Sequence, residues 1–122
     1  MAANDETAQV LAGLWELIGA QQWDRMSDLL DPEVRISYVH TGEVFDREGF
    51  VRLNRDYPGS WQVDVLDMVG AGHRAVSRAR LSDGQETYWV ASFATARDGR
   101  ITELTEVWTD GGQEPPPDRR GR

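Results

Sequence analysis

Strand-like spacing places a carboxylate between two large apolar side chains near the end of the sequence. In the run Thr87–Trp108, two segments rich in aromatic and β-branched residues flank Asp98-Gly99, a dipeptide typical of tight β-hairpins. Because side chains alternate between the faces of a strand, Leu104, Glu106 and Trp108 share one face. If that face is covered, burial raises the pKa of Glu106, and its carboxyl group could act as a general base.

Two other interpretations of this carboxylate stay open. Glu106 could pair with a neighbouring arginine such as Arg78, or it could turn to solvent. A carboxyl group with a shifted pKa occurs at functional sites and also in structural ion pairs. The spacing therefore indicates a pocket without naming a reaction.

Tyr38 and His40 are two further polar side chains that could take part in binding or catalysis. Both fall on one face of an expected strand, and both can donate a hydrogen bond to a ligand carbonyl. The alternative is that they are amphipathic residues at the rim of a core. His73 stands at an expected turn and should be exposed. His40 and Glu43 are close in sequence, but a metal site needs three or four converging ligands, so we predict none.

Aromatic residues are frequent for a chain of this size, with five tryptophans among 122 residues. A predicted apolar ligand pocket is lined by Trp15, Trp61, Trp89, Phe93, Leu104 and Trp108. Packing in the core is the alternative for each, because small cores are built from such side chains, and Trp23 is expected there. Tyr88 should lie on the face opposite to Trp89 and Phe93. Apolar residues on both faces of one strand suggest that a second subunit covers the outer face.

Composition excludes several classes of protein. The length of 122 residues fits one domain, and a net charge of -8 argues against nucleic acid and anionic membrane surfaces as partners. The sequence has no cysteine, which excludes disulfides, thiolate nucleophiles and cysteine-based zinc sites. The start, MAANDETAQ, lacks the features of a secretory signal, and no apolar run approaches the roughly 18 residues of a membrane span. We therefore expect a cytoplasmic protein.

Helical patterns come before most strand patterns along the chain. Expected helices cover residues 4–20, a short segment that opens at Trp23 and stops at Asp31-Pro32, and a segment capped by Asp46. Expected strands cover 34–40, 61–69 and 74–81, followed by the two strands of the hairpin at Asp98-Gly99. Such an order is typical of an α+β fold with helices on one face of a curved, mostly antiparallel sheet.

This order of elements resembles the nuclear transport factor 2-like superfamily, and within it the SnoaL-like, polyketide cyclase-like bacterial branch. The local similarities are Trp23-Asp24, Leu30–Val34, Asp46–Phe50, Asp98–Ile101 and Glu106–Trp108, which span nearly all of residues 5–110. The resemblance implies a cone-shaped sheet wrapped around the N-terminal helices (a cystatin-like α+β barrel), with a pocket at its wide end. It also implies a homodimer formed through the outer sheet face. We expect a single SnoaL-like domain over 1–110 and a flexible tail, rich in Pro and Arg, over 111–122.

Enzymes of this superfamily catalyse several kinds of reaction, and this sequence can be compared with the catalytic residues of each. The base of ketosteroid isomerases falls near Tyr38, their tyrosine on Leu14 and their oxyanion-binding acid near Ala91, so none of the three groups is kept. The Asp-Arg-Asp cluster of limonene-type epoxide hydrolases cannot be assembled from the inward positions. Of the pocket histidines of scytalone-type dehydratases, only His40 is well placed. SnoaL-like cyclases use an aspartate base, for which Glu106 could substitute from a different strand.

Two hypotheses follow. In the first, the protein is a cyclase, isomerase or dehydratase that needs no cofactor and acts on a hydrophobic, carbonyl-bearing, polycyclic or aromatic small molecule. Glu106 is then the acid or base, and Tyr38 and His40 donate hydrogen bonds. In the second, the same fold is a non-catalytic module that binds a ligand or dimerises. Fold alone does not decide between them.

Overall fold

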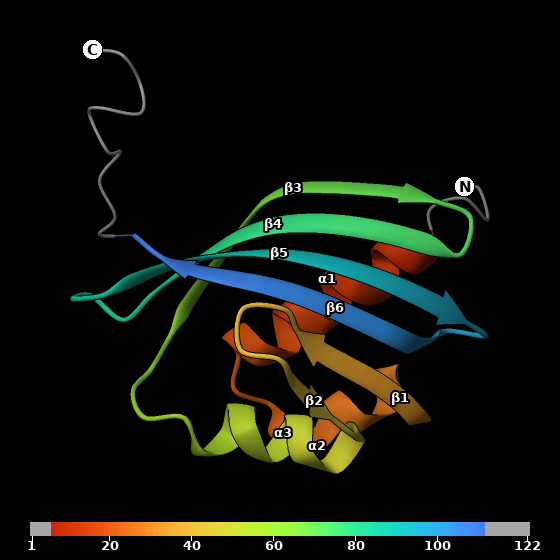
Figure 1. Cartoon of the computed structure of the whole chain (residues 1–122), viewed down its shortest axis with the longest axis horizontal. Helices are drawn as coiled ribbons and strands as arrows, with labels where there is room; N and C mark the ends of the chain where they lie inside the picture. The colour runs from red at the N-terminus through yellow and green to blue at the C-terminus, as the bar shows by residue number, and fades with distance from the viewer. Residues whose placement is uncertain (1–5, 112–122) are drawn as a thin grey trace.

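A computed structural model describes residues 6–111 and shows one curved sheet packed on a long helix (Figure 1). The six strands lie in the order β2-β1-β6-β5-β4-β3. They are β1 (Leu30–Tyr38), β2 (Glu43–Phe45), β3 (Gln62–Ala71), β4 (Arg74–Ser82), β5 (Thr87–Arg97) and β6 (Arg100–Asp110). Only the β1–β6 pair is parallel. The predicted α+β fold with a mostly antiparallel curved sheet is confirmed.

The helices cover one face of this sheet, which we call the inner face; the opposite face is the outer face. They are α1 (Glu6–Gly19), α2 (Trp23–Met26), the 3-10 turn η2 (Ser27–Leu29) and α3 (Arg47–Asp56). The predicted cap of α3 is present, since the Asp46 carboxylate accepts a 2.8 Å hydrogen bond from the backbone N–H of Gly49. The predicted cap at Asn4 and the predicted tail beyond Gly111 lie outside the described residues. No helix within 6–111 is long and apolar enough to cross a membrane.

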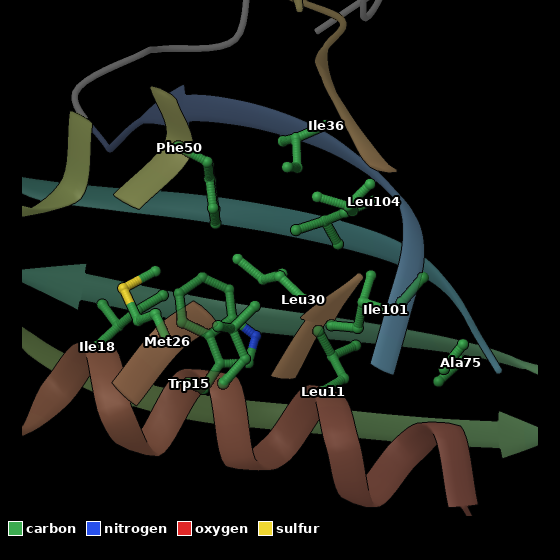
Figure 2. Close-up of a cluster of buried hydrophobic side chains, with 14 of the residues drawn as sticks. Leu11, Trp15, Ile18, Met26, Leu30, Ile36, Phe50, Ala75, Ile101 and Leu104 are labelled. Atoms are coloured by element: carbon green, nitrogen blue, oxygen red, sulfur yellow. The ribbon is translucent and has the colours of Figure 1, made fainter. Parts of the chain in front are cut away.

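The core lies between α1 and the inner face of the sheet (Figure 2). Helix α1 contributes Leu11, Leu14, Trp15 and Ile18, which recur at helical spacing and are all buried. Buried apolar side chains from four strands face them, among them Leu30, Ile36, Ala75, Val90, Ile101 and Leu104. Each fully buried Leu or Ile contributes about 1.5–3 kcal/mol. This packing holds α1 firmly against the strands that carry the polar groups described below.

Strand β1 begins earlier than expected. Its first residue is Leu30, whereas the sequence pattern predicted a helix stop at Asp31-Pro32 and a strand only from Val34. The strand pairs with β6 from Leu30 onwards, and its register shifts between Leu30 and Arg35. Pro32 lies within this irregularity, where the lack of an N–H donor costs no regular ladder hydrogen bond. The three-residue strand β2 was not predicted, because so short a segment carries no periodic signal.

The hairpin at Asp98-Gly99 has the predicted geometry. Both residues have positive φ, 55° for Asp98 and 79° for Gly99, as a type I′ turn requires. The turn joins β5 to β6 and pairs Arg97 with Arg100 and Ala96 with Ile101. A register shift between Thr95 and Ala96 then makes Ser92 the partner of Glu106. The dipeptide therefore fixes the hairpin, and the irregularity beyond it decides which side chain faces the carboxylate.

Candidate functional site

One row of register partners across the inner face carries the polar groups of the site. Ser77 on β4 pairs with Ser92 on β5, Ser92 pairs with Glu106 on β6, and Glu106 pairs with Tyr38 on β1. Tyr38 in turn pairs with Glu43 on β2. Partners across a ladder point to the same face, so five strands bring these five side chains into one line.

Glu106 is buried and held at both carboxylate oxygens. It is 2% exposed; Oε2 accepts a 2.7 Å hydrogen bond from the Ser92 hydroxyl, and Oε1 accepts a 3.0 Å bond from the Trp108 indole N–H. Burial raises the pKa of this carboxyl group from 4.5 to about 7, although both hydrogen bonds act to lower it. Pairing with Arg78, one of the open interpretations, is wrong, because that guanidinium binds Asp67 at 2.7 Å among exposed side chains.

Tyr38 offers a hydroxyl group that makes no hydrogen bond to any other residue within 6–111. Burial, followed by the nearby carboxylates of Glu106 and Glu43, raises the pKa of this phenol well above its ordinary value of 10.0. The hydroxyl therefore keeps its proton at any physiological pH. It can donate that proton in a hydrogen bond to a ligand oxygen.

His40 stacks on Tyr38 with 5.4 Å between ring centroids and 25° between planes. Its Nδ1 accepts a 3.3 Å hydrogen bond from the backbone N–H of Trp108. A ring nitrogen that accepts a hydrogen bond carries no proton, so in the neutral imidazole this bond places the proton on Nε2. Nε2 is then a second donor beside the Tyr38 hydroxyl.

A cavity of about 270 Å³ opens beside this row. Its wall is made of Ile18, Gln21, Trp23, Tyr38, His40, Glu43, Leu53, Asn54, Tyr57, Gly59, Trp61, Leu81, Tyr88 and Trp108. Trp61 links two tyrosines into an aromatic arc, with centroids 5.7 Å from Tyr57 and 5.4 Å from Tyr88. The volume lies near the lower end of ligand pockets, which suits a scaffold of one or two rings.

The predicted site residues separate into three groups. Tyr38, His40, Trp61 and Trp108 line the cavity. Glu106 lies behind the wall and is connected to it by the Trp108 indole. Trp15 and Leu104 belong to the buried core, where the Trp15 indole donates a 3.1 Å hydrogen bond to Ser77 Oγ.

The third group faces away from the cavity. Trp89 and Phe93 alternate along β5 with Val90 and Ser92, which are buried on the inner face, so both point to the outer face. The Arg80 guanidinium lies 5.9 Å from the Trp89 ring on that side. Their predicted place in the pocket is therefore wrong. The sequence showed that residues on both faces of this strand are apolar, but the inner face was assigned to Trp89 and Phe93 instead of to Val90 and its alternate neighbours.

Several cavity residues were missed. Trp23 packs against the core, as expected, and in addition lines the cavity, as do Tyr57 and Tyr88. The Tyr88 position could have been found, because it shares the face of Val90, the buried residue two positions on. Tyr57 follows the end of α3, and no periodic pattern reports where a loop side chain will point.

The chemical groups available here are those of acid–base chemistry. The sequence contains neither cysteine nor lysine, so it offers no thiolate and no lysine amine that could form a Schiff base. No group of three or more His, Cys, Asp or Glu that could hold a metal ion occurs in the described part of the chain. A carboxyl group with a pKa of about 7 lies next to two hydrogen-bond donors at the edge of an apolar cavity.

A curved sheet wrapped on a long helix, with a cavity beside it, defines the nuclear transport factor 2-like class of α+β proteins. Within that class, the family model of the SnoaL-like domain matches residues 11–104. The chain therefore belongs to the SnoaL-like domain family. No curated protein matches its sequence.

Solved structures share this architecture. A candidate ketosteroid isomerase from Kribbella flavida is 26% identical, with a TM-score of 0.84 over 94% of this chain and 87% of that one. A protein of unknown function from Burkholderia xenovorans LB400 is 20% identical, with a TM-score of 0.81 over 98% and 95%. A candidate SnoaL-like polyketide cyclase from Jannaschia sp. CCS1 is 18% identical, with a TM-score of 0.74 over 88% of each chain. The latter two similarities establish the fold alone.

Proposed function

We propose that this protein binds a hydrophobic, carbonyl-bearing small molecule in the cavity and acts on it by acid–base chemistry without a cofactor, as an isomerase, cyclase or dehydratase. The observation that carries the proposal is the buried Glu106 carboxyl group, whose pKa of about 7 is close to the pH at which it would work. The candidate ketosteroid isomerase and polyketide cyclase among the similar structures are consistent with such chemistry.

The roles follow from the groups present. Ionised Glu106 takes a proton from the carbon next to the substrate carbonyl, and the carbonyl oxygen gains the negative charge. The Tyr38 hydroxyl and the Nε2–H of His40 donate hydrogen bonds to that oxygen. Protonated Glu106 then returns the proton to another carbon, or to a leaving hydroxyl group in a dehydration. To reach Glu106, a substrate has to displace the Trp108 indole from Oε1.

Two neighbouring chemistries are poorly supported. The ketosteroid isomerase positions hold Tyr38, Leu14 in the core and Ala91 on the outer side of β5; the flanking inner positions hold Val90 and Ser92, so β5 supplies no acid. In the part of the chain that the structure describes, neither Asp nor Arg lines the cavity, although an epoxide hydrolase of the limonene type would need both there.

A non-catalytic ligand-binding module is the second candidate. It is favoured by the position of Glu106 behind the cavity wall and by the hydrogen bonds at both of its oxygens, which could serve structure alone. In this case a ligand stabilises the fold and leaves the protein unchanged.

We also propose a homodimer formed through the outer face. Phe93 and Val76 are register partners, and each is 40% exposed; Val69, the partner of Val76 on β3, is 67% exposed. Such a row of exposed apolar side chains, which runs from β5 to the edge strand β3, is typical of an interaction surface.

The test of catalysis is proton exchange. Wild type and Glu106→Gln are incubated in deuterated water with cyclic ketones, aromatic polyketides and steroids, and loss of the α-proton signal is followed by NMR. We expect exchange with at least one class by wild type and a loss of at least about a hundredfold in the variant, the scale of general acid–base catalysis. Glu103→Gln, an exposed carboxylate of the same strand, is the matched control. Equal exchange by Glu106→Gln would contradict the assignment, and binding without exchange would favour the second candidate.

A further inference from the structure

The wall of the cavity has an unusual balance of charge. Among the residues that the structure describes, Glu43 is the only acidic side chain of the wall, and no Arg is part of it. The sequence has no lysine. His40 also lines the cavity, and its Nδ1 accepts a hydrogen bond from the backbone N–H of Trp108. A ligand in this cavity therefore meets no Arg or Lys side chain from residues 6–111.

Acidic side chains flank the centre of this wall on both sides. Tyr38 has Glu106 as its register partner on one neighbouring strand and Glu43 on the other. Both carboxylates act, after burial, to raise the pKa of the Tyr38 phenol, as expected for acidic groups close to this side chain. The two acidic groups lie on β6 and β2, and the sequence pattern did not predict that these strands flank β1.

Aromatic rings are the most frequent kind of side chain in this wall. Within residues 6–111, six of them contribute: Trp23, Tyr38, Tyr57, Trp61, Tyr88 and Trp108. The faces of such rings carry negative potential and attract cations, most strongly where water is excluded. An anionic ligand would lose its hydration here and find only the hydrogen-bond donors of Tyr38 and His40, with no Arg or Lys from the described wall to offset its charge, which is costly.

From this arrangement we infer that the cavity selects a ligand whose hydrophobic ring scaffold carries a positively charged nitrogen, and that it rejects carboxylates and phosphates. The inference rests on the proposed function, since it names the class of molecule that the same cavity takes. The charged nitrogen lies against the aromatic wall near Glu43, and the ring scaffold occupies the apolar remainder around Ile18, Leu53 and Leu81.

Three compounds of similar shape and different charge test this inference. 4-Phenylbutan-2-amine is cationic, 4-phenylbutan-2-one is neutral and 4-phenylbutanoate is anionic at about pH 8. Their Kd values are measured by calorimetry with wild type, Glu43→Gln and Glu16→Gln. The Glu16 side chain is an exposed carboxylate of α1 outside the cavity and serves as the matched control.

We expect the amine to bind roughly tenfold more tightly than the ketone, and the carboxylate to bind more weakly than both. Glu43→Gln should reduce the advantage of the amine severalfold, whereas Glu16→Gln should leave it unchanged. Carboxylate binding as tight as that of the amine, or equal affinities for amine and ketone, would overturn the inference and leave the proposed pocket intact. An advantage that survives Glu43→Gln would overturn the part assigned to this carboxylate. If none of the three binds, both the inference and the proposed pocket fail.

Discussion

The Ser92 hydroxyl donates a 2.7 Å hydrogen bond to Oε2 of Glu106 across the β5–β6 ladder, and both side chains are buried. Burial favours the neutral form of the carboxyl group, whereas this hydrogen bond and that of the Trp108 indole favour the charged form. The pKa of about 7 is the balance of these opposed effects. Ser92 thus acts on the chemistry of Glu106 without being part of the cavity wall.

Removing this hydroxyl should raise the pKa of Glu106 above 7. In Ser92→Ala, burial persists while the stronger of the two opposing hydrogen bonds is lost. Trp108→Phe should raise the pKa in the same direction by a smaller amount. The measurement is the ¹³C NMR titration of the Glu106 carboxyl carbon. Ser37→Ala, a change at the neighbour of Tyr38 in β1, is the control. An unchanged or lowered pKa in Ser92→Ala would contradict this account.

The raised pKa of Glu106 should also make stability depend on pH. The folded pKa of about 7 exceeds the ordinary 4.5, so the folded state holds the proton more tightly than the unfolded state. This contribution to the free energy of unfolding is fully present below about pH 4.5 and is lost as pH rises through about 7, a change of about 3 kcal/mol. Urea unfolding of wild type and Glu106→Gln across this range measures it. As pH rises, the free energy of unfolding of wild type should fall relative to that of Glu106→Gln. If the two free energies changed in parallel with pH, a raised pKa of Glu106 in the folded state would be ruled out.

The tryptophans should report ligand binding according to their position. Trp61 and Trp108 line the cavity, whereas Trp15 lies in the core and Trp89 on the outer face. A ligand-induced change in tryptophan fluorescence should therefore fall in Trp61→Phe and Trp108→Phe and persist in Trp89→Phe. The titration uses a saturating cavity ligand, with Trp89→Phe as the matched control. A signal that vanished only in Trp89→Phe would move the binding site to the outer face.

A charge in the outer face should break the proposed dimer. Phe93→Asp places a carboxylate beside Val76 in the exposed apolar row, where burial against a second subunit would leave it unpaired. Sedimentation velocity should show a dimer for wild type and a monomer for the variant. The control is Val39→Asp, which places the same charge at an exposed valine just past the end of β1, and this variant should remain dimeric. A wild type that sediments as a monomer would contradict the proposal.

Local signals in the sequence were sufficient for much of this structure. The helical spacing of Leu11, Leu14 and Ile18 predicts the packed face of α1, and Asp46 predicts the start of α3. Asp98-Gly99 predicts the hairpin, and alternation predicts that Glu106 shares a face with Leu104 and Trp108. These features depend on residues close together in the chain, so a window of a few residues contains their cause.

Only the tertiary structure decided which face of β5 is the inner one and what surrounds the carboxylate. Trp89 and Val90 are both apolar, and burial against α1 selects Val90 and its alternate neighbours. Glu106 meets Ser92, Tyr38 and, one strand further, Glu43 because the register of four strands aligns them, a relation with no counterpart in sequence spacing. By itself the sequence determined that a carboxylate could be buried; long-range strand pairing determined that it lies in a row of polar groups behind an aromatic cavity.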